Sequence, residues 1–284
     1  MLRRVVTVPA LIDVLAGVLA PEYGGSPNAD YIWVLYWIGF GLGIAMFLLV
    51  EGVLIVSLMR DRFRRGRPDA VQVRGNTPLE VGWTLGATAI VAVLAVVTFV
   101  GLPAIVTPPA SDPGGLRVAD GRLYASTDQA PVEGGERPLE IGVNGQQYLW
   151  RYDYPGLRGR LFAYHEMVVP TDTTVVLSIT SQDVAHSWWI PQLGGKMDAL
   201  PGHVNQTWFK ATEPGVFRGQ CAELCGQGHA NMFARVRAVT PDQYRAWTTC
   251  QKQLIKQAQQ ATIPPNRAKP SPLPPQACAS SVKN

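Results

Sequence analysis

The sequence predicts a membrane-anchored all-β protein, in which two long apolar stretches precede a soluble domain of short strands. Residues 32–59 are apolar apart from Glu51, and residues 81–106 carry no charge. After Pro108 the composition changes, and short aliphatic runs alternate with Gly and Pro, which is typical of a sandwich or a barrel. The 284 residues allow one or two domains.

Both apolar stretches are long enough to cross a membrane. At about 1.5 Å rise per residue, each helix exceeds the roughly 30 Å of the hydrocarbon core. We therefore expect a transmembrane hairpin over residues 32–107 with a connecting loop at residues 60–76. Short arginine-rich loops stay in the cytoplasm, and this loop holds six arginines against two aspartates. The arginines are Arg60, Arg62, Arg64, Arg65, Arg67 and Arg74.

This charge bias predicts the location of the whole chain. With the loop inside, the C-terminal part faces the periplasm or the exterior of a bacterial-type cell membrane, and the protein is multi-pass. The first 31 residues allow two interpretations. Arg3 and Arg4 before an apolar stretch that ends near Ala20 fit a short signal peptide. Asp13 and Pro21 argue against cleavage, which leaves an exterior N-terminal arm as the alternative.

The exported domain is expected to span residues 108–240 and to be long enough to bury its own core. Six runs are predicted to form short strands: residues 139–154, 165–169, 173–180, 204–212, 216–220 and 233–239. Residues 241–260 are rich in Gln and Lys and are predicted to form a terminal helix. From Ile263 to residue 284 the Pro-rich composition predicts an extended or disordered tail.

One twelve-residue stretch gives the strongest chemical signal, because it concentrates soft metal ligands between two strand runs. Its chemistry-bearing residues are Cys221, Glu223, Cys225, His229 and Met232. His186 lies upstream, beside Trp188 and Trp189. Thiolate, thioether and imidazole ligands together favour copper over hard cations. A glycine-containing loop held by strands can bring the sulfurs and one imidazole together, so we expect copper electron transfer.

The number of sulfurs limits the kind of copper site. A mononuclear blue-copper site needs one Cys, two His and an axial Met, so one cysteine is left over. Two thiolates can bridge two copper ions, which leaves His186 and His229 as terminal ligands and Met232 as a weak axial ligand. Structural zinc is the main alternative, although zinc modules usually pair C-x2-C with a close His pair. A disulfide between Cys221 and Cys225 would leave the other ligands unexplained.

The run Cys221-Ala-Glu-Leu-Cys225-Gly-Gln-Gly-His229-Ala-Asn-Met232 resembles the dinuclear copper (CuA) motif of cytochrome c oxidase subunit II. Residues 183–188 and 196–206 also resemble segments of that family. The resemblance implies a cupredoxin-like Greek-key barrel whose copper loop lies between the last two strands.

The resemblance also implies a role for each ligand. Cys221 and Cys225 would bridge two copper ions, His186 and His229 would cap them, and Met232 would be axial on one side. Glu223 would give its backbone carbonyl to the other copper. Its carboxylate would reach a Mg ion shared with subunit I, since carboxylates suit hard cations.

The function implied is that of a redox module within a respiratory terminal oxidase. Electrons would pass from a periplasmic donor such as cytochrome c to haem in subunit I, where oxygen is reduced to water and protons are pumped. Subunit I, subunit III and membrane lipid are the expected partners, and no nucleic acid is expected. The alternatives are the CuA-containing subunit of a nitric oxide reductase and a non-enzymatic copper-binding module. A quinol oxidase subunit is disfavoured because that group generally lacks the copper ligands.

Three further positions carry expectations from the same resemblance. Glu80 lies where the family has a Glu at the mouth of a proton-uptake pathway, the alternative being a helix N-terminal acid favoured by the macrodipole. In the aromatic stretch 146–154, Tyr148 stands where the family usually has an exposed Trp that receives electrons. Trp150 is the other candidate on this route and the better core residue. Cross-strand packing is the alternative for both.

The remaining residues of chemical interest are outside the copper motif. Cys250 and Cys278 are candidates for a disulfide in an exported protein, although the composition of the tail argues against fixed geometry. His165 and His203 are expected to be surface or hydrogen-bonded residues. From Pro108 onward there are 17 Lys and Arg against 14 Asp and Glu, so docking of a basic cytochrome would rely on a local patch. The candidate acids of that patch are Asp153, Asp183 and Asp198.

Overall fold

The computed structural model describes residues 22–62, 72, 74–115, 138–154, 161–260 and 278. The chain divides into two compact units. One is a helical unit, residues 33–103, and the other combines residues 1–32 with residues 104–284. The predictions for residues 1–21, for most of the arginine-rich loop and for most of the tail lie outside the described residues.

Two long apolar helices form the N-terminal part, as predicted: α2 (Pro27–Arg62) and α3 (Thr77–Val106). Each is long and apolar enough to cross a membrane, with mean hydropathies of 2.4 and 2.7 in the richest window. No residue of α3 is buried, so its apolar side chains are left for lipid or partner helices to cover. A Cβ built on Gly101 would lie 3.9 Å from Leu35, so the beginning of α2 lies beside the end of α3.

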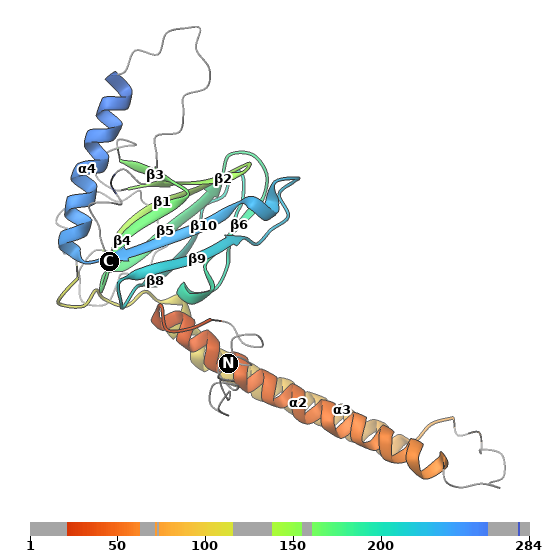
Figure 1. The fold of residues 1–284 in the computed structure, drawn as a ribbon. Helices are drawn as coiled ribbons and strands as arrows, with labels where there is room; N and C mark the ends of the chain where they lie inside the picture. Colours follow the sequence, from red (N-terminus) through yellow and green to blue (C-terminus); the bar gives the residue numbers. More distant parts are fainter. Residues whose placement is uncertain are drawn as a thin grey trace, which may run out of the picture. The chain divides into compact units, whose positions relative to one another are not determined.

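The second unit contains a β-sandwich of two five-stranded sheets (Figure 1). The first sheet has the order β3-β2-β1-β5-β8, and only its β1–β5 pair is parallel. Its strands are β1 (Leu139–Gln146), β2 (Leu149–Asp153), β3 (Phe162–Tyr164), β5 (Thr174–Ser181) and β8 (Asn205–Lys210).

The second sheet has the order β4-β10-β9-β6-β7, with β10 parallel to β4. Its strands are β4 (Glu166–Pro170), β6 (His186–Trp189), β7 (Met197–Ala199), β9 (Gly215–Cys221) and β10 (Phe233–Val239). The last two strands pair antiparallel, so the cysteine-containing loop lies between them as expected. The predicted fold class, apolar helices followed by a cupredoxin-like β domain, is therefore confirmed.

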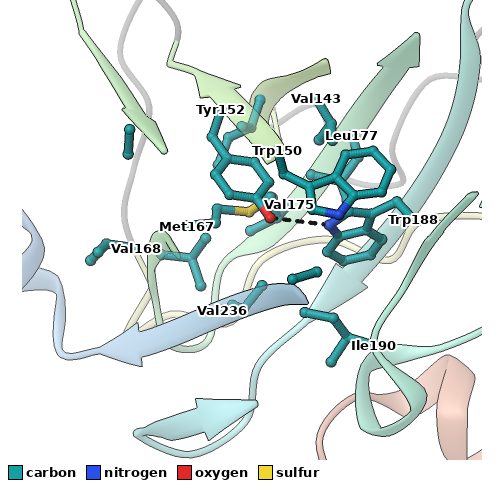
Figure 2. Close-up of a cluster of buried hydrophobic side chains, with 14 of the residues drawn as sticks. Val143, Trp150, Tyr152, Met167, Val168, Val175, Leu177, Trp188, Ile190 and Val236 are labelled. Atoms are coloured by element: carbon teal, nitrogen blue, oxygen red, sulfur yellow. Dashed lines mark hydrogen bonds between the residues drawn. The ribbon is translucent and has the colours of Figure 1, made fainter. Parts of the chain in front are cut away.

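The core lies between the two sheets and follows the period of two of half-buried strands. In β1, for example, Leu139, Ile141 and Val143 are buried while their neighbours are partly exposed. Figure 2 shows Tyr152 of the first sheet meeting Trp188 of the second, with the indole N–H donating to the phenol oxygen at 3.4 Å. Burial raises the pKa of Tyr152 well above its usual range. This polar contact across an apolar core stabilises the stacking of the two sheets.

The structure divides one predicted run and adds three strands. Residues 139–154 contain a hairpin, because a turn at Gln147 and Tyr148 separates β1 from β2. Neither Gln nor Tyr is common in turns, so the sequence does not mark this one. Gly145 is a common turn residue, but it pairs with Trp150 inside the ladder. Strands β3, β6 and β7 have only three or four residues each. Such short strands have no periodicity to detect and exist because a neighbouring strand pairs with them.

Helix α4 (Pro241–Gln260) covers the predicted residues and packs by one face. Tyr244 and Trp247 are buried, and the Trp247 ring lies 5.0 Å from that of Tyr154. Cys250, on this helix, forms a disulfide with Cys278, which is buried. The two Cα atoms are 5.9 Å apart, which is within the usual range for a disulfide. The composition of the tail was therefore a misleading argument, because a disulfide requires only that the two cysteines approach each other.

Strand β8 also holds the ends of both long helices. The Asn28 side chain donates to the Trp208 carbonyl at 2.8 Å, and the Trp208 indole donates to the Ile105 carbonyl at 2.8 Å. The Lys210 backbone N–H donates to the Ser26 hydroxyl at 3.0 Å. The first and third of these bonds are buried and the bond to Ile105 is part-buried, and all three lie within the second unit.

Candidate metal centre

The loop between β9 and β10 is closed by backbone bonds at its base. The Cys221 N–H donates to the Met232 carbonyl at 2.9 Å, and the Ala222 N–H donates to the Ser187 carbonyl at 2.9 Å. A single 3-10 turn, His229–Asn231, returns the chain toward β10. The loop is therefore anchored to its own two strands and to β6, which carries His186.

The sulfur and nitrogen atoms predicted to bind metal converge at one end of the sandwich. The two cysteine Sγ atoms are 3.9 Å apart. His186 Nδ1 lies 3.8 Å from Cys221 Sγ, and His229 Nδ1 lies 3.6 Å from Cys225 Sγ. Each imidazole thus approaches a different sulfur, which is the arrangement expected of two capping ligands around a pair of bridging thiolates.

Two weaker donors complete the cluster. Met232 Sδ lies 3.9 Å from Cys225 Sγ, and the Glu223 carbonyl oxygen lies 3.3 Å from Cys221 Sγ. The thioether is therefore next to the Cys225 sulfur, and the carbonyl oxygen is next to the Cys221 sulfur. The Glu223 side chain itself is exposed. Of the residues predicted as metal ligands, all six contribute an atom to the same small region.

The cluster is largely removed from water. Both cysteines carry free thiols and are buried, as are Met232 and His186, whose exposed fraction is 0%. Burial, and then the neighbouring Cys221, raises the pKa of Cys225 to about 11. The Cys225 thiol is thus poorly suited to ionise by itself, and a bound cation is what would stabilise its thiolate.

His186 is oriented from its second nitrogen. Its Nε2 lies 2.8 Å from Asp183 Oδ1, so that Nδ1 faces Cys221. Burial tends to raise the pKa of Asp183, but bonds from the Gln147 N–H, His186 and the Val184 N–H outweigh it and lower the pKa to about 2. A histidine ligand that donates to a carboxylate is a common second-shell arrangement in metal sites. The sequence suggested Asp183 only as a docking acid.

The donor chemistry fits copper. His186, Cys221 and Cys225 place their ligand atoms within 4.8 Å of one another, and the cluster adds a second imidazole, a thioether and a carbonyl. Structural zinc would use two sulfurs and two nitrogens but has no use for the thioether of Met232. Soft ligands with imidazole suit copper.

The two aromatic candidates lie in different environments. Trp150 is fully buried in the core (Figure 2). The centres of the Trp150 and His186 rings lie 5.9 Å apart in an edge-to-face arrangement. Tyr148 is 37% exposed and packs against the metal loop at Gly228. Tyr148 therefore contacts both solvent and the metal loop. Trp150 packs against the His186 ring from within the core.

The other singled-out residues contribute no atom to the cluster. Glu80 accepts the Asn76 N–H at 3.1 Å, and Asn76 Oδ1 accepts the Leu79 N–H at 3.3 Å, so this carboxylate caps the start of α3. That contact supports the helix-terminal interpretation of Glu80. His165 and His203 are exposed and outside the metal cluster.

The predicted acidic patch is weaker than its residues suggest. Asp153 pairs with Arg151 at 2.8 Å, and Asp183 is bonded to His186. Asp198 is exposed on β7. Two of the three acids therefore already have cationic or hydrogen-bonding partners within the domain.

The fold and the donor set define a class of protein: membrane-associated oxidase subunits with a copper-binding, cupredoxin-like domain. Residues 156–239 match the family model for the periplasmic domain of cytochrome c oxidase subunit II. Cytochrome c oxidase subunit 2 of Synechocystis sp. is 31% identical over 291 aligned residues, which cover 90% of this chain and 86% of that protein. The chain belongs to the cytochrome c oxidase subunit II family.

Two further comparisons show how far the similarity extends. Cytochrome c oxidase subunit 2 of Alkalihalophilus pseudofirmus is 33% identical over 78% of this chain, but the match spans only 59% of that relative's length. Among solved structures, the periplasmic domain of subunit II of cytochrome oxidase of Bradyrhizobium japonicum is 36% identical. It covers 41% of this chain and 95% of its own, with a TM-score of 0.40.

Proposed function

We propose that this chain holds a dinuclear CuA centre and is the electron-accepting subunit of a respiratory terminal oxidase. Electrons would arrive from a periplasmic donor such as cytochrome c and continue to haem in subunit I, where oxygen is reduced to water and protons are pumped. The observation that carries the proposal is the convergence of two thiols, two imidazole Nδ1 atoms, a thioether and a carbonyl within one small cluster, in which both thiols, the thioether and His186 are buried.

Each residue has a stated task in this proposal. Cys221 and Cys225 would bridge two copper ions, with His186 and His229 as caps and Met232 as an axial ligand. The Glu223 carbonyl would be the second axial ligand. When bound, the copper pair supplies a one-electron acceptor and donor. Strands β6, β9 and β10 hold the ligands, and the buried core excludes water, so little rearrangement is needed on reduction.

Four residues outside the copper ligation itself, or with a second group outside it, also have proposed roles. Tyr148 would receive the electron at the surface, and Trp150 would support the His186 ring. The exposed Glu223 carboxylate is free of the cluster and would reach a Mg ion at subunit I. Glu80 remains a proposed proton-pathway residue besides its capping contact. Subunit III, membrane lipid and a periplasmic location of the sandwich complete the proposed setting.

The test is EPR and optical spectroscopy of the purified oxidase, with copper counted per chain. We expect a mixed-valence dinuclear signal, its loss in His229→Ala, and its retention in His203→Ala, because His203 lies outside the cluster. Absence of the signal from the copper-loaded wild type would remove the proposal. The nitric oxide reductase alternative would be excluded if the complex turns over oxygen and not nitric oxide. Identification of the co-purifying large subunit tests the same alternative. Copper bound reversibly without any partner subunit would instead indicate a copper-binding module.

A further inference from the structure

The turn between β1 and β2 contacts the metal loop, although none of its residues is a proposed metal ligand. Gln147, its first residue, forms two hydrogen bonds to groups next to different ligands. Its backbone N–H donates to Asp183 Oδ2 at 2.6 Å, and its side-chain Nε2 donates to the Cys225 carbonyl at 2.7 Å. The separations in sequence are 36 and 78 residues, so only the tertiary fold brings these groups together.

Both partners of Gln147 act directly on the metal cluster. Asp183 uses its other oxygen, Oδ1, to hold His186 Nε2 at 2.8 Å. The Cys225 carbonyl belongs to the ligand that lies closest to His229 and Met232. One residue therefore supports the upstream histidine through a carboxylate and the loop sulfur through the backbone of Cys225.

The next residue of the turn packs onto the same loop. A Cβ built on Gly228 would lie 2.5 Å from Tyr148 Cδ2, and one on Gly226 would lie 2.7 Å from the Tyr148 hydroxyl. The Gly226 position would also bring a Cβ within 2.9 Å of Gln147 Nε2, and its φ is +124°. The loop thus has glycine at the two places where the turn approaches it most closely, so a side chain at either position would push the turn away.

We infer that Gln147 is a positioning residue of the metal centre, whose side-chain amide fixes the Cys225 backbone and thereby the geometry of the bridging sulfur. The inference rests on the proposed function, since it concerns the ligands of that site. A hydrogen-bond donor is required at this position because the Cys225 carbonyl accepts the bond. Leucine would leave this carbonyl unpaired, and glutamate would place a carboxylate oxygen against it.

Sequence and geometry provide a matched control. Gln146 is the neighbouring glutamine, but its side-chain amide donates to Gln182 and to none of the metal-ligand residues. Substitution of Gln146 therefore changes the same hairpin without changing the support of Cys225. Gln147→Lys provides the second control, because an ammonium of similar reach restores a donor to the carbonyl.

The experiment compares copper-loaded oxidase complexes that carry Gln147→Leu, Gln147→Glu, Gln147→Lys or Gln146→Leu. The readouts are the copper hyperfine pattern in EPR, the reduction potential, and copper retention against a copper(I) chelator. We expect Gln147→Leu and Gln147→Glu to change the hyperfine pattern and potential and to lower copper affinity about 10- to 100-fold, as loss of second-shell support typically does. Gln146→Leu should match the wild type, and Gln147→Lys should recover its copper retention.

Wild-type spectra, potential and retention in Gln147→Leu would overturn the inference. Equal losses in Gln147→Leu and Gln147→Lys would also overturn it, because they would show that side-chain shape matters and the donated hydrogen bond does not. These outcomes are distinct from failure of the proposed function, in which the wild-type complex itself would show no mixed-valence copper signal.

Discussion

At the scale of single residues, the metal site depends on side chains that hold ligands as much as on the ligands. His186 is fully buried and could turn either ring nitrogen toward Cys221. The bond from its Nε2 to Asp183 decides which nitrogen faces the sulfur. The ligand set could be predicted from spacing alone, but this choice of nitrogen could not.

Replacement of Asp183 should therefore weaken the site without removing a ligand. We predict that Asp183→Ala lowers copper affinity about 10- to 100-fold, because His186 loses its orienting acceptor. Asp183→Asn should have a smaller effect, since the amide oxygen can still accept from Nε2. Copper stoichiometry after competition with a chelator, together with EPR, measures this. Unchanged copper retention in Asp183→Ala would show that the sandwich orients His186 without help.

Gly219 matters for a steric reason. A Cβ at this position would lie 1.8 Å from the Trp189 carbonyl oxygen, in the pairing of β6 with β9 that sets Trp188 opposite Cys221. We predict that Gly219→Ala destabilises the domain by about 3 kcal/mol or more, because the backbone must move.

Gly215 lies on the same strand and provides the comparison. A Cβ there would meet nothing closer than 3.8 Å, so Gly215→Ala should change stability much less. Thermal unfolding of the purified complex, followed by tryptophan fluorescence, measures both variants. Equal melting temperatures for the two alanine variants would contradict the steric argument.

At the scale of elements, helix α4 is held by packing at its beginning and by a covalent bond in its middle. Tyr244 and Trp247 pack against the sandwich, and the Cys250–Cys278 disulfide closes a segment with a sequence separation of 28. The helix was predictable from composition, whereas the disulfide was not, because chain separation does not reveal spatial approach.

Removal of this disulfide should loosen α4 and leave the copper centre intact. In the chain-entropy model, closing a loop of this length stabilises the folded state by about 3 to 4 kcal/mol. We predict that Cys250→Ser and Cys278→Ser each increase hydrogen exchange in residues 241–260 to a similar extent, while the copper EPR signal is unchanged. Protection equal to that of the wild type in both variants would mean that packing alone holds the helix.

At the scale of the whole molecule, charge determines how a donor protein would approach. Residues 108–284 have 17 basic against 14 acidic residues, and two of the three candidate docking acids already have partners within the domain. We predict that reduction by a basic cytochrome depends only weakly on ionic strength, because steering requires unpaired charge of the opposite sign.

Stopped-flow reduction of the oxidase by basic and acidic cytochromes, over a series of salt concentrations, measures this dependence. Asp198→Asn tests the third acid of the set, which is exposed, and should change the rate constant for the basic donor less than twofold. A steep fall in that rate with added salt would instead show that a local acidic patch guides docking.

The sequence by itself determined the apolar helices, the all-β domain and the ligand types, because these depend on periodicity, hydrophobic length and the chemistry of nearby residues. The motif from Cys221 to Met232 is local, so its spacing could be interpreted directly. Only the tertiary structure decided what depends on how the strands and loops pack: the turn at Gln147, the short strand that carries His186, the orientation of that ring by Asp183, and the disulfide. These contacts join residues 3 to 78 positions apart, and their geometry arises when the two sheets pack.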